Sequence, residues 1–196
     1  MEERYPLRQV SVRLCLAEAE PLYDTRPIDS PERAVEVMAK MMAELDREHL
    51  CVVSLDGQNR PICMNVASIG TVNASLARPA DLMKSAILSN AASFFLIHNH
   101  PSGRLEDGDP VRPSREDRTV TRRMAAVGEL LGIPLLDHVI VSAGTGDTYS
   151  FRERDPSLFQ ASLRQAFSDV ILEKPRPYRG KKKEKDLGRN FHHGRR

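Results

Sequence analysis

The amino-acid sequence predicts an α/β fold in which a mixed central sheet is flanked by helices. Three strongly apolar segments, residues 49–56, 91–100 and 134–142, have the composition of buried strands. A segment over residues 114–131 stands between the last two and carries the signals of a helix start and a helix end. Buried strands that alternate with helices are typical of a sheet covered by helices, so we expect a sandwiched sheet.

The first predicted elements lie before residue 71. Residues 10–16 have strand-like composition. Ser30 is a suitable N-cap and is followed by a proline, and apolar residues then recur at helical spacing over 31–46. Segments 49–56 and 61–70 are strands separated by the turn sequence DGQN, which indicates a hairpin.

The second half of the chain continues the alternation. Residues 79–90 begin with proline and are predicted as a helix. After the strand at 91–100, the glycines and prolines of 101–113 exclude regular structure. Ser114 then begins a helix that Gly132 ends, and the last buried strand follows.

We expect four parts in the chain. A last amphipathic helix is predicted at 156–172, and beyond it the sequence offers little apolar surface to bury. The predicted parts are an N-terminal strand and extension (1–27), the main domain (28–150), a C-terminal helix (151–173) and a basic disordered tail (174–196).

The composition is that of an ordinary globular protein. Of the 196 residues, 40% are hydrophobic and 29% are charged, and no run reaches the roughly 18 apolar residues of a membrane-spanning helix. The N-terminal sequence lacks the basic-then-apolar order of a signal peptide. We therefore expect a cytoplasmic protein with no membrane partner.

Cysteine usage argues against disulfides and against a cysteine-based zinc site. The chain has an odd number of cysteines, and none of them form a C-x-x-C pair: Cys15, Cys51 and Cys63. Each lies in an apolar context, which predicts buried, reduced thiols.

Charge is unevenly distributed. Residues 174–196 carry ten lysines and arginines against two carboxylates, a net charge of +8, so the remainder of the chain carries −6. A basic tail of this kind attracts nucleic acid through its phosphates without reading sequence, which predicts weak binding to nucleic acid. A solubilising extension is the alternative interpretation.

Two histidines close the strand at 91–100. Because side chains alternate along a strand, His98 and His100 point the same way, where a buried strand meets a loop. Zinc accepts two neutral imidazoles and one carboxylate as ligands, so the pair predicts a metal site. A hydrogen-bonded structural pair is the alternative.

A third ligand is expected from a carboxylate near a helix start. PSRED at 113–117 offers Glu116 and Asp117. A fourth position left to water makes such a site catalytic, because the metal lowers the pKa of that water towards neutrality. Ser114 and Asp117 also form a helix-capping pattern, and a cap is compatible with ligation because it holds the carboxylate rigidly.

Three motifs together resemble a known family. HNHPSG, PSREDRTVTRR and LLGIPLLDHVIVS are similar to the JAB/JAMM (MPN) metallohydrolase domain, and most of all to the C-terminal domain of bacterial RadC proteins. The resemblance covers roughly residues 28 to 150. It implies an α/β fold similar to that of cytidine deaminases, and the better-known members of the family cleave peptide or isopeptide bonds.

The resemblance implies roles for five residues. His98, His100 and Asp117 match the residues that bind one zinc ion per chain. Ser114 matches the serine whose hydroxyl stabilises the oxyanion of the tetrahedral intermediate. Glu48 matches the glutamate that acts as general base for the attacking water.

Other polar residues have competing interpretations. Glu48 could be a solvated charge beside Arg47, and Asp81 is then the other candidate carboxylate, although a negative charge at a helix start explains Asp81 structurally. Asp137 and His138 also match the family pattern. They are interpreted either as hydrogen-bond partners of a metal ligand or as a satisfied structural pair.

The chain departs from the family in two places. Thirteen residues separate His100 from Ser114, where the family usually has seven. We interpret the extra polar piece as a looped-out insertion that spares the ligands and covers or reshapes the substrate channel. The helix-hairpin-helix region of RadC proteins has no match in these 196 residues.

Three functions are therefore compared. The first is a zinc-dependent, metallopeptidase-like hydrolase of a peptide or protein substrate that the sequence does not identify. The second is a non-enzymatic, RadC-like DNA-associated protein with a structural zinc and a DNA-binding tail. The third, a deaminase, lacks the P-C-x-x-C motif and cysteine ligands of that class.

Overall fold

A computed structural model describes part of the chain. The described residues are 11, 12, 14–16, 27, 28, 30, 33, 34, 36, 42, 45–70, 77–101, 111–142 and 147–167. The strands are β1 (His49–Leu55), β2 (Pro61–Ile69), β3 (Ser93–His100), β4 (Leu135–Ser142) and β5 (Thr148–Ser150). The helices are α2 (Pro79–Leu82), α3 (Lys84–Leu88), α4 (Arg115–Leu131), α5 (Phe151–Arg154), the 3-10 helix η1 (Pro156–Gln160) and α6 (Leu163–Ala166).

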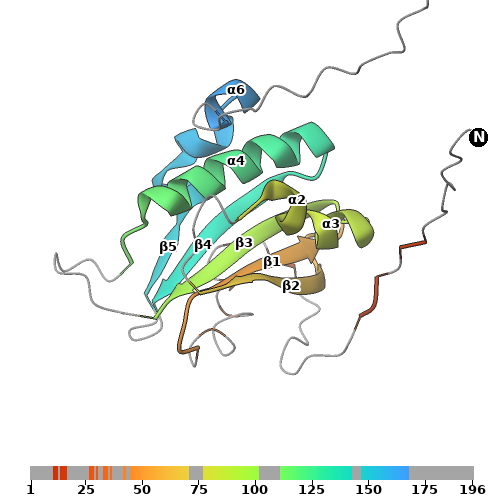
Figure 1. Cartoon of the computed structure of the whole chain (residues 1–196), viewed down its shortest axis with the longest axis horizontal. Coiled ribbons are helices and arrows are strands. Elements are labelled where there is room, and N and C mark those ends of the chain that lie inside the picture. The colour runs from red at the N-terminus through yellow and green to blue at the C-terminus, as the bar shows by residue number, and fades with distance from the viewer. Residues whose placement is uncertain are drawn as a thin grey trace, which may run out of the picture.

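The strands form one mixed sheet in the order β2-β1-β3-β4-β5. Strand β1 runs antiparallel to β2 and β3, and β5 runs antiparallel to β4. Strands β3 and β4 are parallel, which requires a crossover connection, and α4 supplies it (Figure 1). The predicted α/β class with a mixed, helix-flanked sheet is confirmed.

Side-chain alternation divides the core between the two faces of the sheet. On β3, Phe94 and Leu96 pack with α2, α3 and α4, whereas Phe95 and Ile97 pack on the opposite face. That opposite face is covered by the described residues Ile28, Ala34 and Met42. Figure 1 shows α4 lying along the sheet on the same side as α2 and α3. The side chains at the end of β3 that follow the Phe94–Leu96 alternation therefore face α4.

Helix α4 begins and ends where its sequence signals predict. The Ser114 hydroxyl oxygen accepts from the backbone N–H of Asp117, and the Asp117 side chain accepts in return from the backbone N–H of Ser114. Gly132 ends the helix in the left-handed region with φ 69°. The first turn of α4 is thereby fixed in space relative to the end of β3.

The helix predictions elsewhere hold with interruptions. Arg33, Ala34, Glu36 and Met42 are helical, as expected for 31–46, but Leu45 and Asp46 are not, so the helix ends before the predicted boundary. The predicted helix at 79–90 is interrupted at Met83, which separates α2 from α3.

Two predicted elements are wrong in the described residues. The described residues within 10–16 form no strand, and Val12 and Leu16 are exposed, because strand-like composition alone does not supply a partner strand. The helix predicted at 156–172 is broken into η1 and α6 by extended backbone at Ala161 (ψ 129°). Strand β5 was not predicted.

Several predictions concern residues that lie outside the described part of the chain. These are the looped-out insertion, of which 102–110 are not described, and the basic tail at 174–196.

Of the cysteines, Cys51 is buried, and burial raises its pKa to about 12. Cys15 is exposed and Cys63 is half-buried, which corrects the expectation that all three thiols are buried. No helix in the described residues is long and apolar enough to cross a membrane.

A close backbone approach explains one glycine of α4 and generates a stability prediction. A Cβ added at Gly128 would lie 2.6 Å from the carbonyl oxygen of Ile133 and 3.1 Å from the backbone nitrogen of Leu135. Gly128→Ala should therefore lower the free energy of unfolding by about 1–3 kcal/mol through overpacking. Urea denaturation measures the change. Gly57→Ala is the control, because nothing lies within 4 Å of its added Cβ. Equal stability of the two variants would contradict this account.

Candidate metal centre

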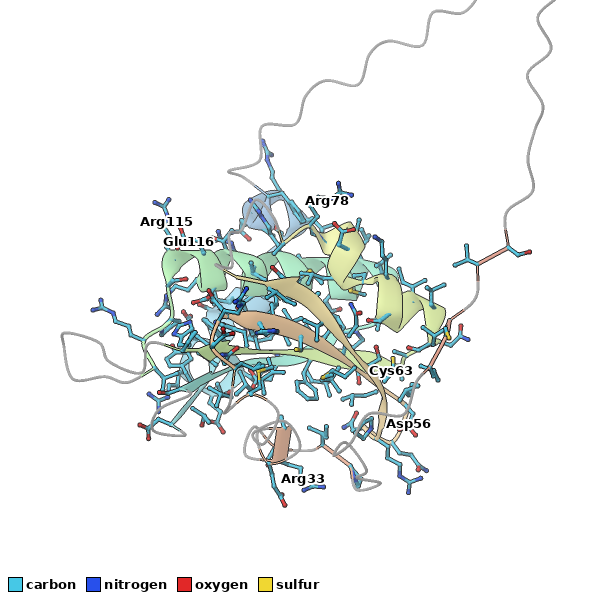
Figure 2. All side chains as sticks on the ribbon, turned by 60° about the horizontal axis from the view of Figure 1, so that its bottom comes forward. Arg33, Asp56, Cys63, Arg78, Arg115 and Glu116 are labelled. Atoms are coloured by element: carbon cyan, nitrogen blue, oxygen red, sulfur yellow. The ribbon has the colours of Figure 1, made fainter. Side chains whose placement is uncertain are left out.

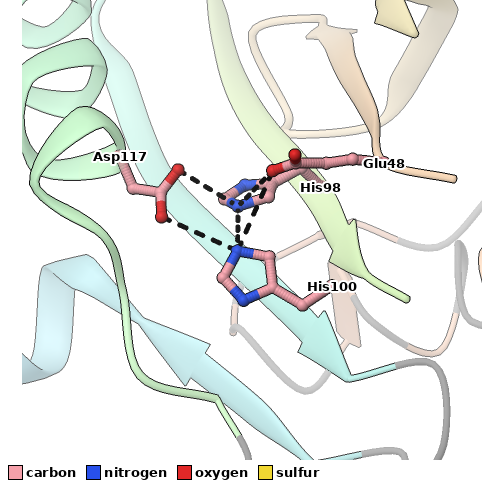
Figure 3. A group of neighbouring side chains, drawn as sticks. All are labelled: Glu48, His98, His100 and Asp117. Carbon is pink, nitrogen blue, oxygen red and sulfur yellow. Dashed lines mark hydrogen bonds and ion pairs between the residues drawn. The ribbon is translucent and has the colours of Figure 1, made fainter. Parts of the chain in front are cut away.

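Four polar side chains from three elements meet at one end of the sheet. Glu48 directly precedes β1, His98 and His100 end β3, and Asp117 lies in the first turn of α4. The antiparallel register pairs Leu50 with His98, which brings the residue before β1 beside the end of β3. One ligand atom from each of the four lies within 4.8 Å of all the others (Figure 3).

The distances between these atoms are short. The Nε2 atoms of His98 and His100 are 3.0 Å apart, and His98 Nε2 lies 3.3 Å from Asp117 Oδ1. Glu48 Oε1 stands slightly farther away, at 3.8 Å from His98 Nε2 and 3.9 Å from His100 Nε2. The atoms therefore surround one common point rather than forming a chain of separate contacts.

The spacing fits a single tetrahedral metal ion. Donors held about 2.0–2.1 Å from a tetrahedral metal lie about 3.3 Å from one another. The distances from His98 Nε2 to His100 Nε2 (3.0 Å) and to Asp117 Oδ1 (3.3 Å) are close to that spacing, and His100 Nε2 lies 3.7 Å from Asp117 Oδ2. Imidazole with carboxylate is a donor set of transition-type metals, whereas Mg²⁺ and Ca²⁺ prefer oxygen ligands alone. This cluster could bind a metal ion.

The helix cap selects which oxygen of Asp117 faces the metal point. Asp117 Oδ2 accepts from both the backbone N–H and the hydroxyl of Ser114, each at 2.7 Å. Oδ1 is the oxygen that approaches His98. The cap thus holds Oδ2, which also lies 3.7 Å from His100 Nε2, and leaves Oδ1 directed at His98. Because the Ser114 hydroxyl donates its hydrogen bond to Asp117 Oδ2, the expected oxyanion donor would have to rotate to reach a substrate.

Burial sets the protonation of the site. Burial is the largest cause that holds the pKa of His98 well below its usual value, and the neighbouring imidazoles add to it. Burial alone would raise the pKa of Asp117, but the contacts with His100, His98 and Ser114 outweigh it and leave that pKa below its ordinary value. At neutral pH the site therefore offers a neutral imidazole and a charged carboxylate, which are the forms that bind a metal.

Asn99 holds the segment that carries Glu48. Its side chain lies on the opposite face of β3 from the two histidines and is fully buried. The amide nitrogen donates to the carbonyl of Arg47 at 3.1 Å, and the amide oxygen accepts from the backbone N–H of His49 at 2.8 Å. These two bonds hold the backbone on both sides of Glu48. Its only signal in the sequence is its place between the two histidines, which by itself predicts no role for the amide.

His138 lies directly behind His98, which agrees with its interpretation as a partner of a metal ligand. Its Nε2 is 2.8 Å from His98 Nδ1, and its Nδ1 is 2.7 Å from the hydroxyl of Thr121. Thr121 was also not singled out from the sequence. Asp137 instead accepts from Ser150 and from two backbone N–H groups, so it has a structural role at the start of α5.

Two alternative carboxylates lie outside the cluster. Glu116 is exposed and projects outward at the start of α4, as Figure 2 shows. Asp81 pairs with Arg78 and Lys84 on the surface of α2 and α3. Of the two carboxylates that the residues alone left open, Asp117 lies in the cluster and Glu116 does not.

Comparisons with known proteins identify the family of this chain. A family model described as "RadC-like JAB domain" matches residues 28–156. Relatives named only as UPF0758 proteins include one from Rubrobacter xylanophilus, 47% identical over 60% of this chain and 49% of the relative. Another, from Roseiflexus castenholzii, is 40% identical over 74% of this chain and 58% of the relative. The chain spans about half the length of the curated relatives it matches.

The buried histidines generate a pH prediction for the metal-free protein. Burial lowers the pKa of His138 to about 4, against about 6.5 in the unfolded chain. The native state therefore binds fewer protons between these values. The stability that His138 contributes is present above about pH 6.5 and is lost progressively as pH falls towards 4, by up to about 3 kcal/mol.

Urea denaturation in the presence of a chelator measures this loss at about pH 7 and about pH 4.5. His138→Gln, which does not titrate, should lose less stability over the same interval than the wild type. Parallel losses in the two proteins would contradict a depressed pKa at His138. Comparing the two also removes the opposing contribution of Asp137, whose pKa is raised by burial.

Proposed function

Because the chain belongs to the RadC-like JAB domain family, we propose that it is a zinc-dependent hydrolase that cleaves a peptide or isopeptide bond. The observation that carries the proposal is the convergence of two imidazoles and two carboxylates on one point, with His98 Nε2 close to tetrahedral spacing from His100 and Asp117. His98, His100 and Asp117 would hold the ion. When bound, zinc lowers the pKa of a water molecule towards neutrality and polarises the carbonyl of the scissile bond.

Glu48 is assigned as the general base. Its Oε1 lies farther from both imidazole nitrogens than the approximately 3.3 Å between direct ligands, which favours a carboxylate beside the attacking water over a fourth ligand. The Glu48 carboxylate accepts a proton from that water and returns it to the leaving amine. The bonds of Asn99 to Arg47 and His49 hold the backbone of Glu48 in place for both transfers.

Ser114 has two assigned roles. Its hydroxyl orients Asp117 within the cap, and after rotation it donates to the oxyanion that forms at the substrate carbonyl. The Ser114 hydroxyl can turn from Asp117 to the oxyanion without leaving Asp117 Oδ2 unpaired, because the backbone N–H of Ser114 still donates to that oxygen.

Three substitutions separate these roles. Glu48→Gln should keep zinc and the fold but remove activity, because an amide cannot accept the proton. Asp117→Asn should weaken zinc binding itself. Ser114→Ala should retain zinc, lose about 100–1,000-fold in kcat, and lose about 1 kcal/mol of stability with the cap. Zinc content, melting temperature and turnover of a panel of peptide and lysine-isopeptide substrates are measured for each variant.

The matched control is Glu116→Gln, which removes a charge from the same helix turn outside the cluster and should change none of the three. Loss of zinc in Glu48→Gln would make Glu48 a ligand and not the base. An inactive wild type with one zinc per chain would favour the non-enzymatic, DNA-associated alternative.

We also propose nucleic acid as a partner of the basic tail. The support is the net charge of +8 over residues 174–196. Fluorescence anisotropy with a DNA duplex should show weak binding that falls steeply as salt is raised, and a chain ending at residue 173 should not bind under the same conditions. Equal binding by both chains would assign the contact to the body of the protein.

A further inference from the structure

A line of hydrogen bonds runs through the core behind the metal site. His98 Nδ1 is 2.8 Å from His138 Nε2, and His138 Nδ1 is 2.7 Å from the hydroxyl oxygen of Thr121. The Thr121 hydroxyl lies 2.7 Å from the backbone carbonyl oxygen of Asp117. All four residues are buried, and His98 and Thr121 are 0% exposed.

The order of donors along this line is fixed by its last member. The carbonyl oxygen of Asp117 carries no proton, so the Thr121 hydroxyl must donate to it. A hydroxyl has one proton, and the Thr121 oxygen can therefore only accept from His138, which places a proton on His138 Nδ1.

The same reasoning continues through the two rings. A neutral His138 with a proton on Nδ1 has a lone pair on Nε2, and that lone pair accepts from His98 Nδ1–H. A neutral His98 with its proton on Nδ1 presents a lone pair on Nε2. This Nε2 atom faces the other candidate metal-ligand atoms, which belong to Asp117, His100 and Glu48.

We propose that Thr121 and His138 are positioning residues that lock His98 in the Nδ1–H tautomer and thereby aim its Nε2 lone pair at the metal. The inference rests on the metal-binding part of the proposed function. Neither residue touches the metal point, and both act through His98. The line begins and ends at the same site. The Asp117 side chain supplies a candidate metal-ligand atom, and the Asp117 backbone carbonyl accepts the last hydrogen bond of the line.

Thr121→Val tests the assignment, because it removes the hydroxyl and keeps the shape. The first measurement is the ¹⁵N spectrum of the histidine rings in metal-free protein. Wild-type His98 and His138 should both carry their proton on Nδ1, and in Thr121→Val this preference should be lost. The second is zinc affinity by competition with a chelator, which should fall about 10–100-fold in Thr121→Val. Thr121→Ser restores the hydroxyl and should restore both readings.

The matched control is Thr119→Val. Thr119 lies on the same helix and donates the same kind of hydroxyl bond, to the backbone carbonyl of Arg115 four residues earlier at 3.0 Å. Among the described residues, no hydrogen bond joins Thr119 to a histidine. An equal loss of zinc affinity in Thr119→Val would assign the effect to the helix and overturn the proposal. A proton on Nε2 of His98 in the metal-free wild type would overturn it without any variant. Because neither reading requires turnover, an inactive wild type would count against the hydrolase and not against this line.

Discussion

The burial of one neutral imidazole constrains the rest of this structure. His98 is 0% exposed, so neither of its ring nitrogens can be satisfied by bulk water. Nδ1 contacts His138 on β4, and Nε2 faces the carboxylates of Asp117 on α4 and of Glu48 before β1. The ring therefore ties the parallel pairing of β3 with β4 to the placement of α4. A shift of any of these elements would leave a buried polar atom unpaired, which costs about 1–3 kcal/mol.

The start of α4 serves structure and chemistry with one set of contacts. The reciprocal bonds between Ser114 and Asp117 satisfy backbone N–H groups that no helix can satisfy internally. They also hold carboxylate oxygen Oδ2 and leave Oδ1 directed at His98. The positive end of the helix dipole favours the charged form of Asp117 at this position. A pattern that is common at helix starts is thus sufficient to hold a ligand rigidly.

The elements that position the site were largely predictable because their signals are local. Apolar runs located β1, β3 and β4, and Ser114 and Gly132 marked the limits of α4. The break at Ala161 was missed because the spacing of apolar residues stays helical across it. Thr121 was missed for a different reason. In the sequence it is an ordinary helical threonine, and its contact with His138 exists only after α4 has packed against the sheet. The family resemblance supplied Glu48, which local spacing alone does not connect to residues fifty positions later.

The tripeptide at the end of β3 assigns its two faces different tasks. His98 and His100 face α4, whereas Asn99 faces the other way and holds the backbone beside Glu48. Because strand side chains repeat every two residues, a slip of one residue between β1 and β3 would exchange these faces completely. It would turn both imidazoles into the apolar layer and the amide towards α4. A shifted register would therefore cost free energy on both faces of the sheet at once. The polar residues of the site thus also favour the correct strand register while the hydrophobic core assembles.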